Sequence, residues 1–464
     1  MFERLNGLDE GMLAGETPEW HMHAGALLVL EPLPGHEGET AANIDAVLRS
    51  RHNQLGAFRH QLLPTPLGLS PSSWVDLPDA DLASRVRRVD VPKPGGAREV
   101  AAIAAKIFSV PLDRKELLWE IWVLEGLQGG HAALLVKVHH ALMDGLRATR
   151  LFEVLFDVVP EAPLERPDAE ADPTATAPTP LARLTATAEY LATTPIRAIR
   201  FGGELAWAGV RVARVLASPA GRNAMLPFRA PRTSLNRRLT ANRSFAFASA
   251  NLDDMKAVKR AFNVTMNDVV LAMTAHALRE YLLDRDELPT RPLVAQIPVG
   301  VSKSLTGTGG NAVAATGCSL ATHTADPVER LAAIHSSMQS AKALQSAMGD
   351  DMVVDALSVI PGAALSTGLA FYRGLGLDRL HPPIFNAIVS NVPGPPIALY
   401  THGARLVAGY TFGPLLAGCA LNVTMMSYQD QIDFGIATCP DVVDDPWLIA
   451  EAIPEGLDVL LKRV

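Results

Sequence analysis

Cysteine is scarce in this sequence: among 464 residues only Cys318, Cys419 and Cys439 carry a thiol. None of them belongs to a Cys-x-x-Cys pair or to a cysteine–histidine spacing of the kind that binds zinc. An odd and sparse set is typical of a reducing compartment, where such thiols serve as small apolar side chains. The cysteine content therefore argues against a disulfide-stabilised fold, and we expect a cytoplasmic protein.

The sequence also lacks a continuous apolar run of about 18 residues, the length that a membrane-spanning helix requires. Its first residues, Met1 to Gly7, do not form the basic stretch followed by an apolar core that marks a secretory signal peptide. We therefore expect a chain that does not span a membrane and is either soluble or bound to a membrane surface.

An excess of positive charge is missing as well. The chain has 41 basic and 49 acidic residues, which gives a formal net charge of −8. Nucleic-acid-binding proteins usually carry a strongly basic surface, so the overall charge does not favour that class. Apolar residues, in contrast, make up 48% of the chain, enough to bury large cores in two domains of about 150–200 residues each.

The first part of the chain mixes predicted strands and helices. Apolar runs at 24–30, 120–124 and 132–138 predict buried strands, and a glycine-rich turn joins the last two. The apolar positions of residues 97–108 fall on one helical face and predict a helix, which Pro111 ends. This mixture places the first part in the α/β or α+β class.

Two changes in composition divide the chain. Residues 158–180 hold six prolines among Ala, Thr, Asp and Glu, which predicts an extended linker. Residues 181–243 contain eleven arginines and no lysine against two glutamates, with apolar residues at near-helical spacing. A basic amphipathic helix of this type can lie on an anionic membrane surface, or it can pack on its own protein with its arginines in water. We expect three parts, 1–157, 158–243 and 244–464.

The last part of the chain again mixes the two kinds of element. Strands are predicted at 244–252 and 293–301, and a hairpin is predicted at 422–438. The spacing of Thr265 and Asp268 before an apolar run is typical of a capping box that opens a helix. The whole chain is therefore expected to be an α/β (α+β) protein.

One stretch carries the clearest indication of chemistry. The apolar run 132–138 ends in His139 and His140, and Asp144 and Gly145 follow. Imidazole is suited to take and return a proton near neutral pH, and a strand end can present it rigidly to a cleft. Because consecutive side chains leaving a strand point to opposite sides, at most one of the two histidines can face a given cavity.

Three interpretations of this stretch compete. A metal site would need the two rings to converge, but neighbouring histidines splay apart, and His21 and His23 are weak candidates for further ligands. Buried histidines that bond only to the backbone would be structural. A general base with a supporting aspartate is the third interpretation, and the local pattern alone does not decide between it and a structural role.

The motif His139-His140-x-x-x-Asp144-Gly145 matches the H-H-x-x-x-D-G signature of the CoA-dependent acyltransferase superfamily. From about Leu5 to about Leu461, further motifs occur in an order that resembles bacterial wax ester synthase/acyl-CoA:diacylglycerol acyltransferases. These motifs are LNGLD at 5–9, ETP at 16–18, MHAG at 22–25, FR at 58–59, PLDR at 111–114, LWE at 118–120, ND at 267–268, SNVPGP at 390–395 and SY at 427–428. The ordered set is far more specific than the histidine motif alone.

The resemblance implies two chloramphenicol-acetyltransferase-like domains, with mixed sheets flanked by helices and an active-site tunnel at their junction. It implies an O-acyltransferase that moves a long-chain acyl group from acyl-CoA to diacylglycerol or to a long-chain alcohol. Acyl-CoA would be a substrate, and no cofactor or metal is implied. Such an enzyme would work at the cytoplasmic membrane face or on lipid inclusions, where its lipid substrates are dissolved.

The resemblance also implies roles for the motif residues. His140 would be the general base that acts without a covalent acyl-enzyme, and His139 would face away and stabilise the loop. The sequence has no Gly-x-Ser-x-Gly nucleophile elbow, which agrees with direct transfer. Asp144 would pair with an arginine that holds the loop, for which Arg59 is the first candidate and Arg51 the second.

Three further residues complete the expected site. Gly145, which has no Cβ, would let backbone and substrate approach closely. Asn267 and Asp268 would either place an amide near the reacting carbonyl or cap the helix that they open. Two other functions stay open: a non-catalytic relative that binds acyl-CoA or lipid, and an acyltransferase whose donor is bound to a carrier protein.

Overall fold

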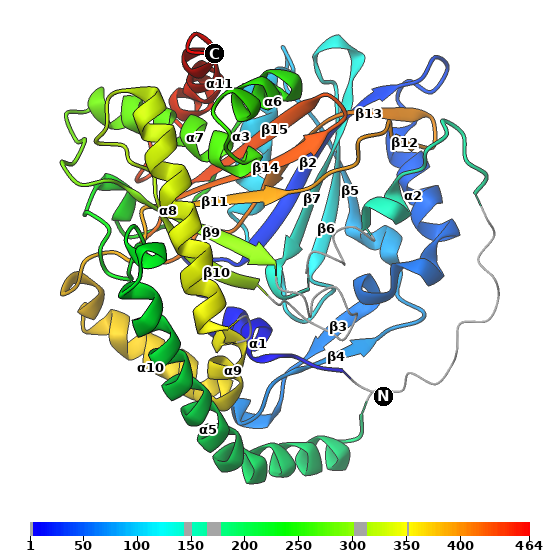
Figure 1. The fold of residues 1–464 in the computed structure, drawn as a ribbon. Helices are drawn as coiled ribbons and strands as arrows, with labels where there is room; N and C mark the ends of the chain where they lie inside the picture. Colours follow the sequence, from blue (N-terminus) through cyan, green and yellow to red (C-terminus); the bar gives the residue numbers. More distant parts are fainter. Residues whose placement is uncertain (1–2, 143–150, 165–177, 301–312, 350–351) are drawn as a thin grey trace.

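Two six-stranded sheets, each flanked by helices, make up most of the molecule (Figure 1). The computed structural model describes residues 3–142, 151–164, 178–300, 313–349 and 352–464. A small antiparallel sheet lies beside the first large one and has the order β1 (Glu3–Arg4), β4 (Ser73–Asp76), β3 (His60–Leu63). The predicted α/β (α+β) class is confirmed.

The first large sheet carries the histidine motif. Its order is β12 (Tyr400–Thr401), β13 (Ala404–Phe412), β2 (His23–Pro32), β7 (Ala132–His139), β6 (Trp119–Glu125), β5 (Val86–Asp90). Neighbouring strands are antiparallel except β5 and β6, which are parallel. The three strands predicted in the first part of the chain are confirmed as β2, β6 and β7. All eight residues of β7 are buried, which is why it is an almost unbroken apolar run.

The second large sheet is built from the last part of the chain. Its order is β10 (Val313–Ser319), β9 (Val294–Gly300), β11 (Ala387–Val392), β14 (Leu421–Tyr428), β15 (Gln431–Thr438), β8 (Ser244–Asn251). Strand β11 runs parallel to β9 and to β14, and the other pairs are antiparallel. The predicted strands at 244–252 and 293–301 and the hairpin at 422–438 are confirmed.

The two halves of the chain share one sheet and one core. Strand β13 comes from the last part of the chain but pairs with β2 of the first part. Phe108, Phe245 and Phe412 belong to a helix of the first part, to β8 and to β13, and their ring centroids lie 4.5–6.2 Å apart. Aromatic rings at these distances pack favourably, so a continuous apolar core joins the halves.

The helices pack against the sheets and against one another. The described helices are α1 (Gly7–Gly15), α2 (Thr40–Ser50), α3 (Ala97–Phe108), α5 (Pro180–Leu216), α6 (Leu252–Ala261), α7 (Met266–Leu283), α8 (Pro327–Met348), α9 (Met352–Val359), α10 (Gly362–Gly374) and α11 (Trp447–Leu461). Short 3₁₀ turns include η1 (His52–Arg59), η2 (Pro66–Gly68) and η5 (His140–Leu142). The helix predicted at 97–108 is confirmed as α3, and all three cysteines are buried and unpaired.

The segment between the halves takes an unusual form. Residues 165–177 of the predicted linker lie outside the described residues, and α5 follows them with 37 residues. Pro195 lies inside α5, and the helix bends where it turns upward along α8 in Figure 1. Only Thr187, Tyr190 and Ala208 of this helix are buried, so most of its surface faces solvent.

Candidate active site

The end of β7 is fixed by backbone hydrogen bonds from both sides. His139 is the last residue of this strand and lies opposite His23 of β2. Its amide donates to the carbonyl of Leu118 at 2.9 Å, and the amide of His140 donates to the carbonyl of Met22 at 2.7 Å. The two consecutive residues are therefore held by different neighbouring segments, which fixes the backbone that carries the imidazoles.

His139 is a buried side chain with a defined orientation. Its ring is 1% exposed, and its Nδ1 accepts a hydrogen bond of 3.1 Å from the amide of Ala141. In the neutral ring the proton therefore sits on Nε2, and this atom lies 3.5 Å from Oε2 of Glu16. The ring is oriented by contacts at both of its nitrogens, as is typical of a positioning residue.

Glu16 joins three separate parts of the chain at this point. Its Oε1 accepts from the amide of Met22 at 3.1 Å, and its Oε2 accepts from Nη2 of Arg114 at 2.7 Å. Burial alone would raise the pKa of Glu16, but the hydrogen bonds and charges of His139 and Arg114 outweigh it and hold the pKa well below its usual range. Glu16 is therefore a carboxylate at all ordinary pH values.

The roles of Glu16 and Arg114 were not predicted from the sequence. Both occur in the ordered motifs, at 16–18 and 111–114, and Met22 occurs in a third motif. The structure brings these motifs together beside the histidine pair, although 98 positions separate Glu16 from Arg114. Membership of the ordered motifs was thus the signal in the sequence that could have indicated Glu16 and Arg114. Only the fold shows that their side chains meet beside the histidine pair.

His140 differs from its neighbour in its surroundings. It is partly exposed, whereas His139 is buried. Burial of most of the ring, followed by the repulsion of His139, lowers the pKa of His140 to about 4, while a hydrogen bond to its own backbone acts in the opposite direction. At neutral pH the imidazole is uncharged, so one ring nitrogen has the lone pair that a general base needs.

Two further histidines lie at the start of β2: His23 is its first residue, and His21 precedes it. His21 and His23 stack with ring centroids 5.1 Å apart, and Nε2 of His23 accepts from the amide of Leu112 at 3.3 Å. Burial is the main cause that lowers the pKa of His21 to about 4, and it also places the pKa of His23 well below its usual value. Over the described ranges, no group of three or more His, Cys, Asp or Glu side chains is arranged to hold a metal ion.

The motif that contains Arg59 lies beside β6. The indole Nε1 of Trp119 donates to the carbonyl of Phe58 at 2.7 Å, and the two rings pack edge to face. The guanidinium of Arg59 binds Asp76 at 3.0 Å. Asp144 lies outside the described residues, so its pairing with Arg59 stays a prediction.

Arg51, the second candidate for that pairing, binds other groups. Its guanidinium donates to the carbonyl of Val154 at 2.7 Å and forms an ion pair with Asp157. Gly145 also lies outside the described residues, and its proposed close approach to substrate stays a prediction.

The predicted capping box at the start of α7 is confirmed. The amide of Asp268 donates to Oγ1 of Thr265 at 3.2 Å, and the amide of Thr265 donates to Oδ2 of Asp268 at 2.8 Å. The same carboxylate oxygen lies 2.7 Å from Nδ1 of His335. Asp268 therefore caps α7, while Asn267 lies in the first turn of that helix and its role toward substrate stays a prediction.

The motifs at 390–395 and 427–428 contact each other at the end of β14. The amide of Gly394 donates to Oγ of Ser427 at 3.2 Å, and a Cβ on Gly394 would lie only 2.0 Å from the carbonyl oxygen of Ser427. The hydroxyl of Tyr428 donates to the carbonyl of Leu406 and accepts from the amide of Leu399, both at 3.0 Å. These motifs connect the second sheet to β13 of the first.

Two mixed sheets and an unequal histidine pair at a strand end define a protein of the condensation-domain and acyltransferase fold. A condensation domain of a calcium-dependent antibiotic synthetase has a similar fold, with a TM-score of 0.56 and 15% identity over 99% of this chain and 97% of that one. At this identity the likeness concerns the fold alone.

The family of this chain follows from matches of its sequence to known protein families. The sequence matches the wax ester synthase/diacylglycerol acyltransferase catalytic domain over residues 5–270 and the C-terminal domain of the same family over residues 309–461. The chain belongs to this family and is an acyltransferase.

Proteins that are similar to this chain in sequence carry names that agree with this assignment. A Mycobacterium tuberculosis protein named as a diacylglycerol O-acyltransferase is 35% identical over 462 residues, which is 99% of this chain and 90% of the relative. A second one is 38% identical over 440 residues, 94% of each chain. The solved wax ester synthase/diacylglycerol acyltransferase of Marinobacter aquaeolei is 28% identical, with a TM-score of 0.70 over 99% of both chains.

Proposed function

We propose that this enzyme transfers a long-chain acyl group from acyl-CoA to the hydroxyl of diacylglycerol or of a long-chain alcohol. The products are triacylglycerol or a wax ester, together with free CoA. The observation that carries the proposal is the neutral, partly exposed His140 beside the buried and fixed His139. The names of the mycobacterial and Marinobacter relatives support the choice of acceptors.

His140 acts as a general base and then as a general acid. Its unprotonated ring nitrogen takes the proton of the acceptor hydroxyl while the oxygen forms a bond to the thioester carbonyl carbon. The carbon–sulfur bond then breaks, and the imidazolium returns the proton to the departing CoA sulfur. The acceptor gains the acyl group and loses its proton, and CoA loses the acyl group and gains that proton. The reaction therefore needs no cofactor, and acyl-CoA takes part only as a substrate.

The surrounding residues position this base. Glu16 binds His139 and Arg114 and also accepts a hydrogen bond from the amide of Met22. The carbonyl of Met22 in turn accepts a hydrogen bond from the amide of His140. These contacts hold the backbone that carries His140. A base contributes fully only when its nitrogen is held within hydrogen-bonding distance of the hydroxyl. We expect Asp144 and Gly145 to complete this arrangement from the loop that follows.

The pH dependence of the reaction should reflect the lowered pKa of His140. A general base works only when unprotonated, so activity is lost as the pH falls through its pKa, which lies at about 4. Initial rates at low acyl-CoA, measured from pH 8 to pH 5, should therefore show no loss from protonation of the base. A decline with a midpoint near pH 6.5, the ordinary value for histidine, would contradict this assignment.

The acceptor is tested directly with radiolabelled palmitoyl-CoA and either diolein or hexadecanol. We expect labelled triacylglycerol or wax ester and an equal amount of CoA thiol. Saturable binding of acyl-CoA without product from any alcohol would favour a non-catalytic binding protein. Product formation only from an acyl group on a carrier protein would favour the carrier-dependent alternative.

We also propose that the enzyme works at the cytoplasmic face of the membrane or on lipid inclusions. Diacylglycerol and long-chain alcohols are dissolved in lipid rather than in water, so the enzyme must reach a lipid surface to bind them. The basic and largely exposed helix α5 supports a peripheral contact of this kind.

A further inference from the structure

Helices α9 and α10 form an apolar pair on the surface of the protein. None of the eight described residues of α9 is fully buried, and Gly362 is the one buried residue of α10. Phe371 is 64% exposed and Leu375, which follows α10, is 59% exposed. Within the described residues no single helix is long and apolar enough to cross a membrane, and these two pass the same test only when taken together across a 97° bend.

Four exposed residues of α10 and of the position after it follow a helical period. Ala364, Gly368, Phe371 and Leu375 are all exposed, and their spacings of four, three and four positions place them on one face. A helix in a water-soluble domain normally turns its apolar face inward. In α10 both sides are apolar: Leu365 and Leu369 are partly buried, while Phe371 is exposed and is not covered by any other part of the described chain.

Helix α5 extends this apolar surface. The hydroxyl of Tyr190 donates to the carbonyl of Ser358 at 2.8 Å, which fastens α5 to α9. Tyr190 and Ala208 are buried, and Ile199 lies nine positions from each of them, about two and a half helical turns. Ile199 therefore points away from the protein, where it is 77% exposed, and Trp207 is 66% exposed.

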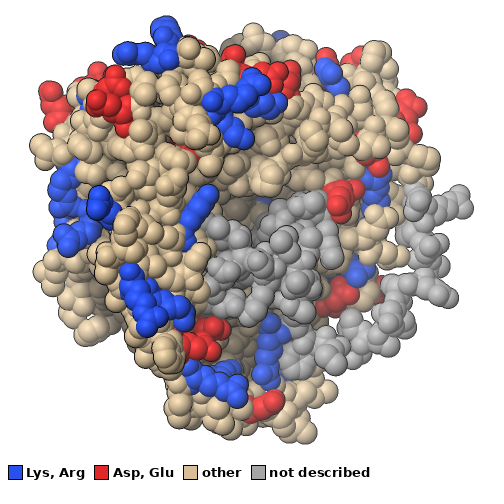
Figure 2. Space-filling model, viewed as in Figure 1, with Lys and Arg blue, Asp and Glu red and all other residues tan. Residues whose placement is uncertain are grey.

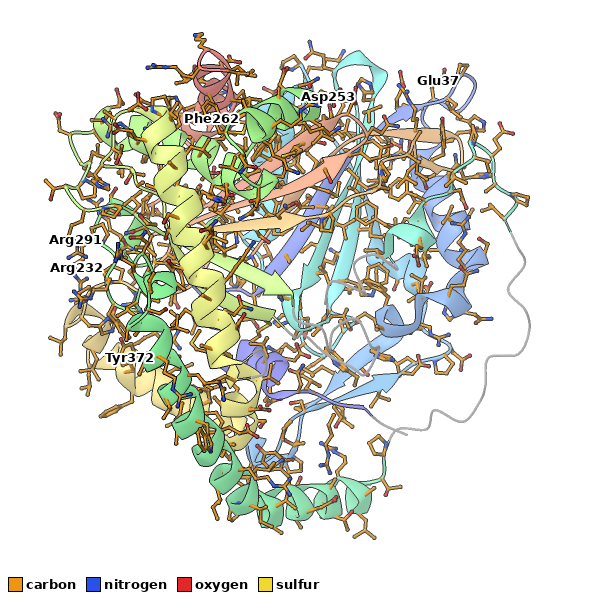
Figure 3. All side chains as sticks on the ribbon, in the orientation of Figure 1. Glu37, Arg232, Asp253, Phe262, Arg291 and Tyr372 are labelled. Atoms are coloured by element: carbon orange, nitrogen blue, oxygen red, sulfur yellow. The ribbon has the colours of Figure 1, made fainter. Side chains whose placement is uncertain are left out.

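The charges beside this surface are mostly positive. Helix α5 carries five arginines and two glutamates. At the far end of α10, Arg232 donates to the carbonyl of Arg379 at 2.7 Å, and Figure 3 shows Arg232 and Arg291 on the same side of the molecule as Tyr372 of α10. In Figure 2 the surface around α10, at the lower left, is mostly uncharged and is bordered by blue groups. Apolar area rimmed by arginine complements an anionic lipid surface.

The apolar surface adjoins the active site through one helix. Helix α1 packs against α9 and α10 and also against η5, the turn that begins with His140. Its contact with α9 is close, since a Cβ on Gly7 would lie 2.3 Å from the backbone nitrogen of Ser358. Glu16, which binds His139, directly follows this helix. A lipid surface on α9 and α10 would thus lie one helix away from the catalytic base.

We infer that the apolar surface formed by α9, α10 and the outward face of α5 inserts into an anionic phospholipid leaflet. The active site then lies next to the leaflet and receives its lipid acceptor from it. The inference rests on the proposed function for the nature of the acceptor. Insertion removes the apolar side chains from water, and the arginines bind lipid phosphates at the rim.

The first test measures binding to vesicles by flotation. Wild type should float with vesicles of phosphatidylcholine and phosphatidylglycerol and much less with phosphatidylcholine alone. The double variant Phe371→Glu, Leu375→Glu should bind the anionic vesicles at least about tenfold more weakly, because it places two charges where apolar side chains enter lipid. Leu448→Glu is the matched control: Leu448 is 42% exposed on α11, at the opposite end of the molecule in Figure 1, and its change should leave binding unaltered.

Three results would overturn the inference. In the first, wild-type protein does not float with anionic vesicles. In the second, the double variant floats as well as wild type. In the third, the Leu448→Glu control loses as much binding as the double variant. If wild type fails to float but dimerises, and the double variant is monomeric, the surface is an interface between two copies of this chain. Thermal unfolding of each variant confirms that the fold is intact.

A second measurement separates this inference from the proposed function. The double variant should retain wild-type turnover with diolein dispersed in detergent and lose most of it with diolein embedded in anionic vesicles. Equal loss in both assays would contradict a docking role. Failure of wild type to form ester in either assay would contradict the proposed function, whatever the vesicle binding shows.

Discussion

Replacing His140 by alanine should lower kcat for ester formation by about 10²–10⁴-fold, the usual contribution of a general base. The variant removes the neutral imidazole that takes the hydroxyl proton, while Glu16, His139 and Arg114 still hold the strand end. Because acyl-CoA binding does not require the base, its KM should change much less than kcat. Initial rates with labelled palmitoyl-CoA and diolein or hexadecanol give both constants.

The matched control for this variant is His131→Ala at the other end of β7. His131 is also partly exposed, but it precedes the strand, and its ring lies 3.2 Å from the nearby carbonyl of Gln128. Its kcat should equal that of wild type. If His140→Ala were as active as wild type, His140 would not be the base.

Replacing Glu16 by glutamine should reduce kcat by about tenfold or more and destabilise the fold by about 1–3 kcal/mol. The amide keeps the size of the side chain, but it removes the negative charge that faces His139 and Arg114. Its NH₂ group would also oppose a donor, either Arg114 or the amide of Met22. Urea unfolding measures the free energy of unfolding, and initial rates measure kcat and KM.

A surface carboxylate provides the control for Glu16. Glu31 binds Arg405, and both side chains are almost half exposed, so Glu31→Gln should change the free energy of unfolding by less than about 1 kcal/mol. Its kcat should stay at the wild-type value. Glu16→Gln with wild-type kcat and wild-type stability would show that this carboxylate does not position the histidine pair.

Sequence patterns within a few residues predicted most of the helices and strands whose formation depends on neighbouring residues in the chain. The strands β2, β6 and β7 are apolar runs, α3 has a clear helical period, and the capping box of Thr265 and Asp268 lies within four residues. Strand β13 was not predicted, because its place is set by pairing with β2 almost 400 positions earlier. Helix α10 was missed as well, since glycines and apolar residues occur on both its exposed and its partly buried sides and leave no single apolar face in the sequence.

The candidate site was predicted in part. The histidine motif and its resemblance indicated His139 and His140 as unequal partners, and the structure places one buried and the other partly exposed. Glu16 and Arg114 gave no local signal, because an isolated glutamate and an isolated arginine look like surface residues until the fold brings them together. The pairing of Asp268 with His335 was missed for the same reason, since 67 positions separate them.

Catalysis by His140 as a general base requires that the acyl group pass straight from CoA to the acceptor, and this transfer can be measured directly. Enzyme is mixed with an equimolar amount of labelled palmitoyl-CoA without acceptor and quenched in acid, and the label on the precipitated protein is counted. We expect no label on the protein and, once diolein or hexadecanol is added, labelled ester in an amount equal to the CoA thiol released. Label that remains bound to the denatured protein would reveal a covalent acyl-enzyme and contradict direct transfer by His140.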